Sequence, residues 1–229
     1  MDVLLLGLGA VDLGRASAAL AAAGGRVEAQ SLPARPERVE LNAVLERRDE
    51  RRLVITADTA SLAVVLRRLL RRGELATAET AVLPTVDVPF LAGHGVPTDL
   101  ARAAVVALAA PCRTVGVLKD DSGDVVVDSA GLRPETGRRA WVRAYVDDER
   151  LADGPVSWLR VQRPAGGGLR ATVAAGRFAR PRTVEGRALQ LACDPCRLSS
   201  DGRDREQPRR RRTWWDEPDQ WRLAVGNAR

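Results

Sequence analysis

The chain has 229 residues, of which 45% are hydrophobic and only 3% aromatic, so Leu, Val and Ala must form its core. Its net charge is +6, but all of its 36 basic residues except Lys119 are Arg, which fits a GC-rich coding bias and singles out no anionic partner. No apolar run approaches the roughly 18 residues of a membrane-spanning helix, and Asp2 does not fit a signal peptide. We therefore expect a cytoplasmic protein.

Apolar runs alternate with amphipathic segments in the first half of the chain. The predicted strands are residues 3–6, 26–30, 53–56 and 80–84. The predicted helices are residues 16–23, 37–48, a segment that ends at Gly73, and 99–108. An irregular loop is expected up to Pro97. This alternation predicts an α/β domain with a mainly parallel, Rossmann-like sheet over residues 1–114.

From residue 115 the pattern changes to short alternating runs that are separated by turn residues. The runs are residues 125–127, 141–146, 157–161, 169–173, 188–193 and 221–225. The arginine run 209–212 is expected to lie in a loop. The second half is therefore predicted to be an antiparallel, β-sandwich-like domain over residues 115–229.

Three segments carry a further pattern. Residues 53–62 (LVITADTASL) run from a strand into a helix, residues 82–97 (VLPTVDVPFLAGHGVP) follow the next strand, and residues 200–203 read SDGR. In order and spacing they resemble the GGDGT loop, the P-x-GTxND-F-A…LGIP loop and the D-G-E motif of the diacylglycerol kinase catalytic family, which is related to NAD kinases. The resemblance implies ATP and Mg²⁺ as cofactors and a lipid hydroxyl as the acceptor.

The first of these loops has lost its glycines. Thr56, Ala57 and Ala60 stand in their place, while Asp58 and Thr59 match the family. Glycines let the backbone approach phosphate oxygens closely, and a Cβ at each position crowds a triphosphate and restricts the loop.

The other two motifs are eroded as well. The second loop lacks the Gly-Thr and Asn-Asp pairs, and only Asp87 and Phe90 match. Arg203 replaces the carboxylate of D-G-E and cannot be a general base, which leaves Asp201 as the catalytic candidate. We predict a degenerate member with weak or no catalysis and a regulatory or scaffold role. The nucleotide-binding residues that the resemblance implies are Thr56, Ala57, Asp58, Thr59, Ala60, Thr85 and Asp87.

The C-terminal segment permits a second hypothesis. Residues 209–212 are all Arg, and Trp214, Trp215 and Trp221 follow. Such a segment suits a non-enzymatic binding module that contacts an anionic membrane or a protein partner. The competing interpretation is a packed hairpin, and nucleic acid is not an expected partner.

Two smaller motifs are weak. Residues 7–14 (GLGAVDLG) resemble a dinucleotide fingerprint, but the third glycine comes two residues late, so a tight turn is the other interpretation. Cys193 and Cys196 form a lone CxxC, and His94 is distant in sequence, so no metal site is predicted.

Overall fold

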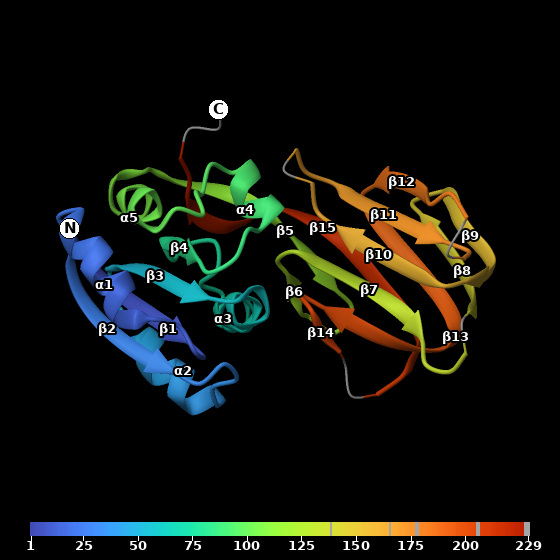
Figure 1. The fold of residues 1–229 in the computed structure, drawn as a ribbon, viewed down its shortest axis with the longest axis horizontal. Coiled ribbons are helices and arrows are strands. Elements are labelled where there is room, and N and C mark those ends of the chain that lie inside the picture. Colours follow the sequence, from blue (N-terminus) through green and yellow to red (C-terminus); the bar gives the residue numbers. More distant parts are fainter. Residues whose placement is uncertain (138, 165, 177–178, 205–206, 227–229) are drawn as a thin grey trace. The chain divides into compact units, whose positions relative to one another are not determined.

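The computed structural model describes residues 1–137, 139–164, 166–176, 179–204 and 207–226. The chain forms two compact units, Met1–Val115 with Asp219–Arg229, and Gly116–Pro218 (Figure 1). The chain passes from one unit to the other within β5 (Cys112–Asp120) and returns within β15 (Arg209–Ala224). The end of the chain thus groups with the first unit, whereas the sequence placed the domain boundary at residues 114 and 115 and gave everything after it to the second.

A parallel sheet forms the centre of the first unit, in the order β2-β1-β3-β4. Its strands are β1 (Asp2–Leu8), β2 (Arg26–Leu32), β3 (Arg52–Ala57) and β4 (Thr80–Pro84). The end of β15 joins beside β4, where Leu223 pairs with Thr80. Every residue of β3 is buried, as expected for a strand that is covered on both faces. The predicted α/β fold is confirmed.

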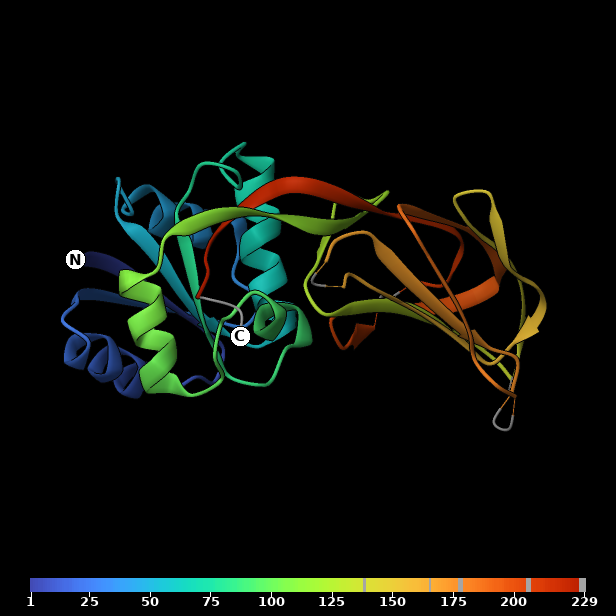
Figure 2. The ribbon, with the colours of Figure 1, turned by 90° about the horizontal axis from the view of Figure 1, so that it is seen from above.

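Helices cover both faces of this sheet. They are α1 (Leu13–Ala22), α2 (Arg38–Glu46), α3 (Thr59–Arg71), α4 (Pro89–Gly93) and α5 (Leu100–Ala109). α1 and α5 share one apolar cluster with the sheet, and α3 lies on the opposite face (Figure 2). The expected irregular loop before Pro97 contains α4, because Pro89 has the fixed φ that suits a first helical turn. None of these helices, all within the described residues, is long and apolar enough to cross a membrane.

The second unit is built from antiparallel strands around one apolar core, which confirms the predicted β-rich half. Its strands besides β5 and β15 are β6 (Val125–Val126), β7 (Ser129–Pro134), β8 (Ala140–Val146), β9 (Glu149–Val156), β10 (Trp158–Gln162), β11 (Leu169–Ala174), β12 (Arg182–Gly186), β13 (Ala188–Ser200) and β14 (Arg203–Asp204). The register of β13 shifts between Ala192 and Cys196. Before the shift β13 pairs with β8 and β15, and after it with β7, so two layers share this strand.

The loop predicted at residues 209–212 is wrong, because these arginines begin β15. Arg212 points into the unit, is 5% exposed, and pairs with the carboxylates of Asp120 and Asp121. Trp214, two residues further on, is 2% exposed in the same core. The two carboxylates offset the cost of burying the Arg212 charge. The sequence of the arginine run does not show that such partners exist.

Candidate nucleotide site

The carboxyl ends of β1, β3 and β4 meet at one edge of the parallel sheet. Because β2 lies on one side of β1 while β3 and β4 lie on the other, the strand order reverses between β1 and β3. In open α/β sheets ligands bind outside the carboxyl ends of the strands at such a point. The two loops of the sequence resemblance follow β3 and β4, so the fold brings both to this edge.

The end of β3 and the first turn of α3 are packed by their own side chains. Thr56 and Ala57 are each 5% exposed and Ala60 is 8% exposed, so their Cβ atoms are packed inside. Asp58 is the N-cap of α3, and its Oδ1 accepts a hydrogen bond of 2.6 Å from the backbone N–H of Ser61. A helix N-terminus ordinarily attracts a phosphate. Here the Asp58 carboxylate occupies one of these N–H groups, that of Ser61.

The loop after β4 lies beside the first loop. The hydroxyl of Thr85 donates a hydrogen bond of 3.1 Å to the carbonyl of Ala57, which joins the two loops. Asp87 is exposed and borders a cavity of about 740 Å³ that is lined by residues of α4 and α5. Arg102, in the first turn of α5, lines the same cavity. Phe90 is packed against Trp221, with parallel rings 6.1 Å apart, and serves the core.

Arg102 is a candidate ligand contact that the sequence did not reveal. It stands fifteen positions after Asp87, and only the fold places both at one cavity. No three His, Cys, Asp or Glu side chains gather as metal ligands within the part of the chain that the structure describes. A magnesium ion would therefore depend on nucleotide phosphates for most of its ligands, as is common for Mg²⁺.

The glycines of residues 7–14 are explained by a tight turn. A Cβ on Gly7 would lie 2.8 Å from Cδ1 of Leu13, so the missing side chain lets the start of α1 pack on β1. Gly9 has φ +74° and donates a backbone hydrogen bond to Leu32. Asp12 caps α1 through the N–H of Arg15 at 2.8 Å. A second helix at this edge thus begins with a carboxylate.

Asp201, the catalytic candidate, belongs to the second unit and holds a turn. It has φ +51° and Gly202 has φ +79°, and the flanking Ser200 and Arg203 pair across them, which is the geometry of a two-residue hairpin. The Asp201 carboxylate accepts hydrogen bonds from the backbone N–H groups of residues 127–129, the shortest 2.6 Å from Asp128. Burial raises the pKa of Asp201 to about 7, although these hydrogen bonds lower it.

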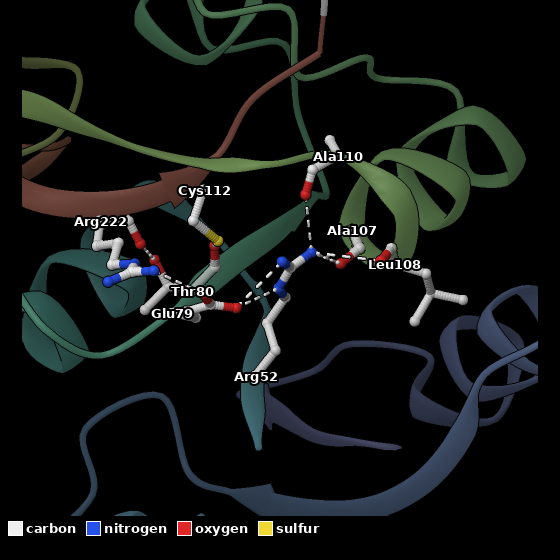
Figure 3. Close-up of polar contacts among 8 residues, drawn as sticks. All are labelled: Arg52, Glu79, Thr80, Ala107, Leu108, Ala110, Cys112 and Arg222. Atoms are coloured by element: carbon white, nitrogen blue, oxygen red, sulfur yellow. Dashed lines mark hydrogen bonds and ion pairs between the residues drawn. The ribbon is translucent and has the colours of Figure 1, made fainter. Parts of the chain in front are cut away.

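At the opposite, amino edge of the sheet lies a polar cluster that the sequence did not reveal (Figure 3). Arg52, 6% exposed, donates to the carbonyls of Ala107 at 2.8 Å and Ala110 at 3.1 Å, where α5 ends. Arg52 also pairs with Glu79 at 3.1 Å, and Glu79 pairs with Arg222 of β15 at 2.8 Å. Burial opposes ionisation of Glu79, but the two arginines outweigh it and lower its pKa. This cluster ties α5 and the end of β15 to the sheet.

No family model matches the sequence, and no curated protein is similar to it. Solved structures do match. A diacylglycerol kinase from Bacillus anthracis str. Sterne has a TM-score of 0.69 at 14% identity, over 99% of this chain and 97% of that chain. An NAD kinase from Archaeoglobus fulgidus in complex with ATP has 0.64 at 13%, over 98% and 93%. Yeast NADH kinase complexed with NADH has 0.57 at 12%, over 100% and 84%. The chain has the fold of diacylglycerol kinase-like proteins and NAD kinases, as the sequence predicted.

Proposed function

We propose that the chain is a diacylglycerol-kinase-like protein that has lost efficient phosphoryl transfer and acts as a regulatory or scaffold protein. It keeps a weak nucleotide site at the carboxyl edge of β1, β3 and β4. The residues proposed for this site are Thr56, Ala57, Asp58, Thr59, Ala60, Thr85, Asp87 and Arg102.

The observation that carries this proposal is the packing at the start of α3. The side chains of Thr56, Ala57 and Ala60 are buried where the resembled motif has glycines. A triphosphate at this edge would meet a backbone that has lost the conformational freedom of glycine. This loss weakens phosphate binding.

Features at the same edge support residual binding. The cavity beside Asp87 has a volume in the range of small-molecule sites. Arg102 supplies it with a cation that can offset phosphate charge. ATP and NADH are the nucleotides held by two of the similar structures, so MgATP is the first ligand to test.

The second unit offers no efficient catalytic group at the D-G-E motif. Arg203 cannot accept a proton from an acceptor hydroxyl. The Asp201 carboxylate is occupied by three backbone N–H groups of residues 127–129. Loss of the general base, together with a weakened phosphate loop, removes two of the elements that phosphoryl transfer needs.

A phosphotransfer assay tests the proposal. The wild type is incubated with radiolabelled ATP, Mg²⁺ and diacylglycerol in mixed micelles, and Asp201→Asn serves as the matched control for contaminating kinase. We expect equal and negligible phosphatidic acid from both proteins. Turnover by the wild type in the range of about 1–100 s⁻¹ that kinases show would sink the proposal.

The alternative of a C-terminal binding module loses two of its three tryptophans. Trp214 is 2% exposed and Trp221 is 1% exposed, and the indole N–H of Trp221 donates to the hydroxyl of Thr80. The packed interpretation therefore holds for both, and neither can contact a membrane or a partner. Trp215 is partly exposed, and its indole N–H donates to Glu217 at 2.9 Å.

A further inference from the structure

Two cysteines of the second unit lie together in its apolar core. Cys193 is 8% exposed and Cys196 is fully buried, and both are free thiols on β13. In a regular strand, side chains three positions apart point to opposite faces of the sheet. Here both side chains join the same apolar cluster. A local irregularity of β13 must therefore turn them to one side.

The irregularity is a bulge in β13. Ala192 pairs with Arg211 of β15. The next pair along the two strands joins Cys196 to Arg209. Four steps of β13 thus lie against two steps of β15, which span about 7 Å rather than the roughly 13 Å of four extended steps. The segment 193–196 is compressed by the extra residues, so the side chains at its two ends can meet.

Contacts with both neighbouring strands hold this bulge in place. On the β8 side, the Asp194 carboxylate accepts a hydrogen bond of 2.9 Å from the backbone N–H of Trp141. On the β15 side, the thiol of Cys193 donates to the carbonyl of Arg209 at 3.6 Å. Pro195 has no N–H that an interrupted ladder would leave unpaired. The bulge is therefore a built feature that keeps both thiols on one side of β13.

The two thiols differ in acidity. Their mutual hydrogen bond lowers the pKa of Cys196, although burial raises it. The same hydrogen bond and burial both raise the pKa of Cys193, and the charge of Asp194 acts in that direction too. The thiolate is the nucleophile in thiol–disulfide exchange. Cys196 is therefore the cysteine that reacts first, with the thiol of Cys193 beside it.

We propose that Cys193 and Cys196 form a reversible redox pair that closes to a disulfide by exchange with a small-molecule disulfide such as oxidised glutathione. The Cys196 thiolate attacks one sulfur of the small disulfide and releases a small thiolate, which leaves a mixed disulfide on Cys196. The Cys193 thiol gives its proton to the released thiolate and attacks the Cys196 sulfur. This step expels the second small thiolate, which takes up the proton that Cys196 had lost. Two protein thiols are thereby oxidised, and one small disulfide is reduced to two thiols.

The position of the pair gives the disulfide an effect on the fold. Before the bulge β13 pairs with β8 and β15, and after it with β7, so the strand passes between two layers at this point. A disulfide there fixes this passage, and its reduction releases it. Because the ladder with β15 is interrupted at the bulge, local opening can admit the small disulfide to Cys196. The pair and its partners belong to the second unit, so the inference does not depend on the proposed nucleotide site.

Redox titration of the full chain tests this inference. The folded wild type is equilibrated with reduced and oxidised glutathione, its free thiols are blocked with N-ethylmaleimide, and it is digested with trypsin without reduction. Cys193 and Cys196 share the tryptic peptide 188–197, whereas Cys112 lies in the peptide 103–113 and serves as the internal control. At about equal concentrations of the two forms of glutathione, we expect about half or more of the peptide 188–197 to be unblocked and disulfide-bonded. Excess reduced glutathione should restore its thiols, and the peptide 103–113 should stay reduced.

Two serine variants test the order of the exchange. Cys193→Ser should retain glutathione on Cys196 as a mixed disulfide, because no second thiol displaces it. Cys196→Ser should gain at least about tenfold less glutathione, since only the thiol with the raised pKa is left in the pair. Circular dichroism checks that both variants fold. Equal amounts of glutathione on the two folded variants would contradict Cys196 as the first nucleophile.

Two results with the wild type would overturn the proposal. The peptide 188–197 could stay reduced in the folded chain but become oxidised after unfolding in urea, and the two thiols would then serve only as core packing. The folded chain could instead gain glutathione on both cysteines without an internal disulfide, which would show that the bulge does not bring the thiols within reach of each other.

Discussion

The two ends of strand β3 differ in how their charges are used. At the amino end Arg52 is buried and bonds to Glu79 and to the last carbonyls of α5. At the carboxyl end Asp58 is exposed and bonds to the helix that follows it. The first end holds distant parts of the chain together, whereas the second begins the helix that follows it in the chain.

This difference separates charged side chains that stabilise the fold from those that lie near the candidate site. Charge at the amino end is buried, paired and structural. Charge at the carboxyl end caps two helix N-termini, through Asp12 and Asp58. One end of the strand thus joins distant segments, and the other begins the helix that borders the candidate site.

The largest expected effect comes from removing the buried charge at the amino end. Arg52→Ala leaves the carbonyls of Ala107 and Ala110 without their buried donor and removes one of the two arginines that pair with Glu79, so we expect the free energy of unfolding to fall by about 3 kcal/mol. Urea unfolding monitored by circular dichroism measures it. Arg51→Ala is the matched control, because Arg51 pairs with the half-exposed Glu28 and should cost less than about 1 kcal/mol. Equal losses of unfolding free energy in both variants would show that Arg52 contributes no more than a surface ion pair.

The next effect extends the comparison to a buried carboxylate in the second unit. Burial raises the pKa of Asp201 to about 7, above its ordinary value of 3.8. Its contribution to stability is therefore complete below the ordinary value and is lost as the pH rises through 7. We expect the wild type to lose about 2 kcal/mol between pH 5 and pH 8, and Asp201→Asn, which keeps the acceptor oxygen and the turn, to show a flatter profile. Parallel profiles for the two proteins would exclude this titration.

A smaller effect is expected where the end of β15 packs beside the polar cluster of Arg52, Glu79 and Arg222. Trp221→Phe keeps the ring packed on Phe90 but removes the donor to the Thr80 hydroxyl, a hydrogen bond of 2.6 Å. The expected loss is about 1 kcal/mol, read from thermal unfolding. Trp215→Phe, which removes a partly exposed N–H donor, should change the melting temperature less. The reverse order would show that Trp221 does not anchor the end of the chain.

A stability effect of similar size belongs to the carboxyl end. Asp58→Ala removes the N-cap of α3 and should cost about 1 kcal/mol, whereas Asp58→Asn, which can still cap, should cost little. Denaturant unfolding of the two variants side by side separates the cap from the charge. If Asn is as costly as Ala, the carboxylate has a partner beyond the helix N-terminus.

Much of the fold followed from sequence periodicity. The predicted strand at residues 80–84 matches β4, and the helix ending at Gly73 corresponds to α3, because an uninterrupted apolar run and a clear apolar stripe dominate there. The arginines at the start of β15 were misplaced in a loop, since only pairing with Ala192 and burial beside Asp121 make them a strand. Local propensity cannot show such long-range partners.

The candidate site stays a prediction from the motif resemblance. Asp58, Thr85 and Asp87 were proposed because they stand at positions of the two resembled loops. Arg102 was not proposed from the sequence, because its place at the cavity depends on how α5 packs. Arg52 was missed for a similar reason. An arginine at the start of an apolar run is typical of an exposed strand end, and the partners of Arg52 lie 27 to 58 residues away in sequence.

The most direct test of the central claim, an eroded but surviving nucleotide site, is isothermal calorimetry of MgATP with the wild type and Asp58→Ala. We predict saturable binding with a Kd of about 1 mM in the wild type, and its loss in the variant, because Asp58 is the proposed site residue whose carboxylate could hold Mg²⁺ against the phosphates. Absence of binding at millimolar nucleotide would contradict a surviving site. Micromolar affinity accompanied by lipid phosphorylation would contradict erosion.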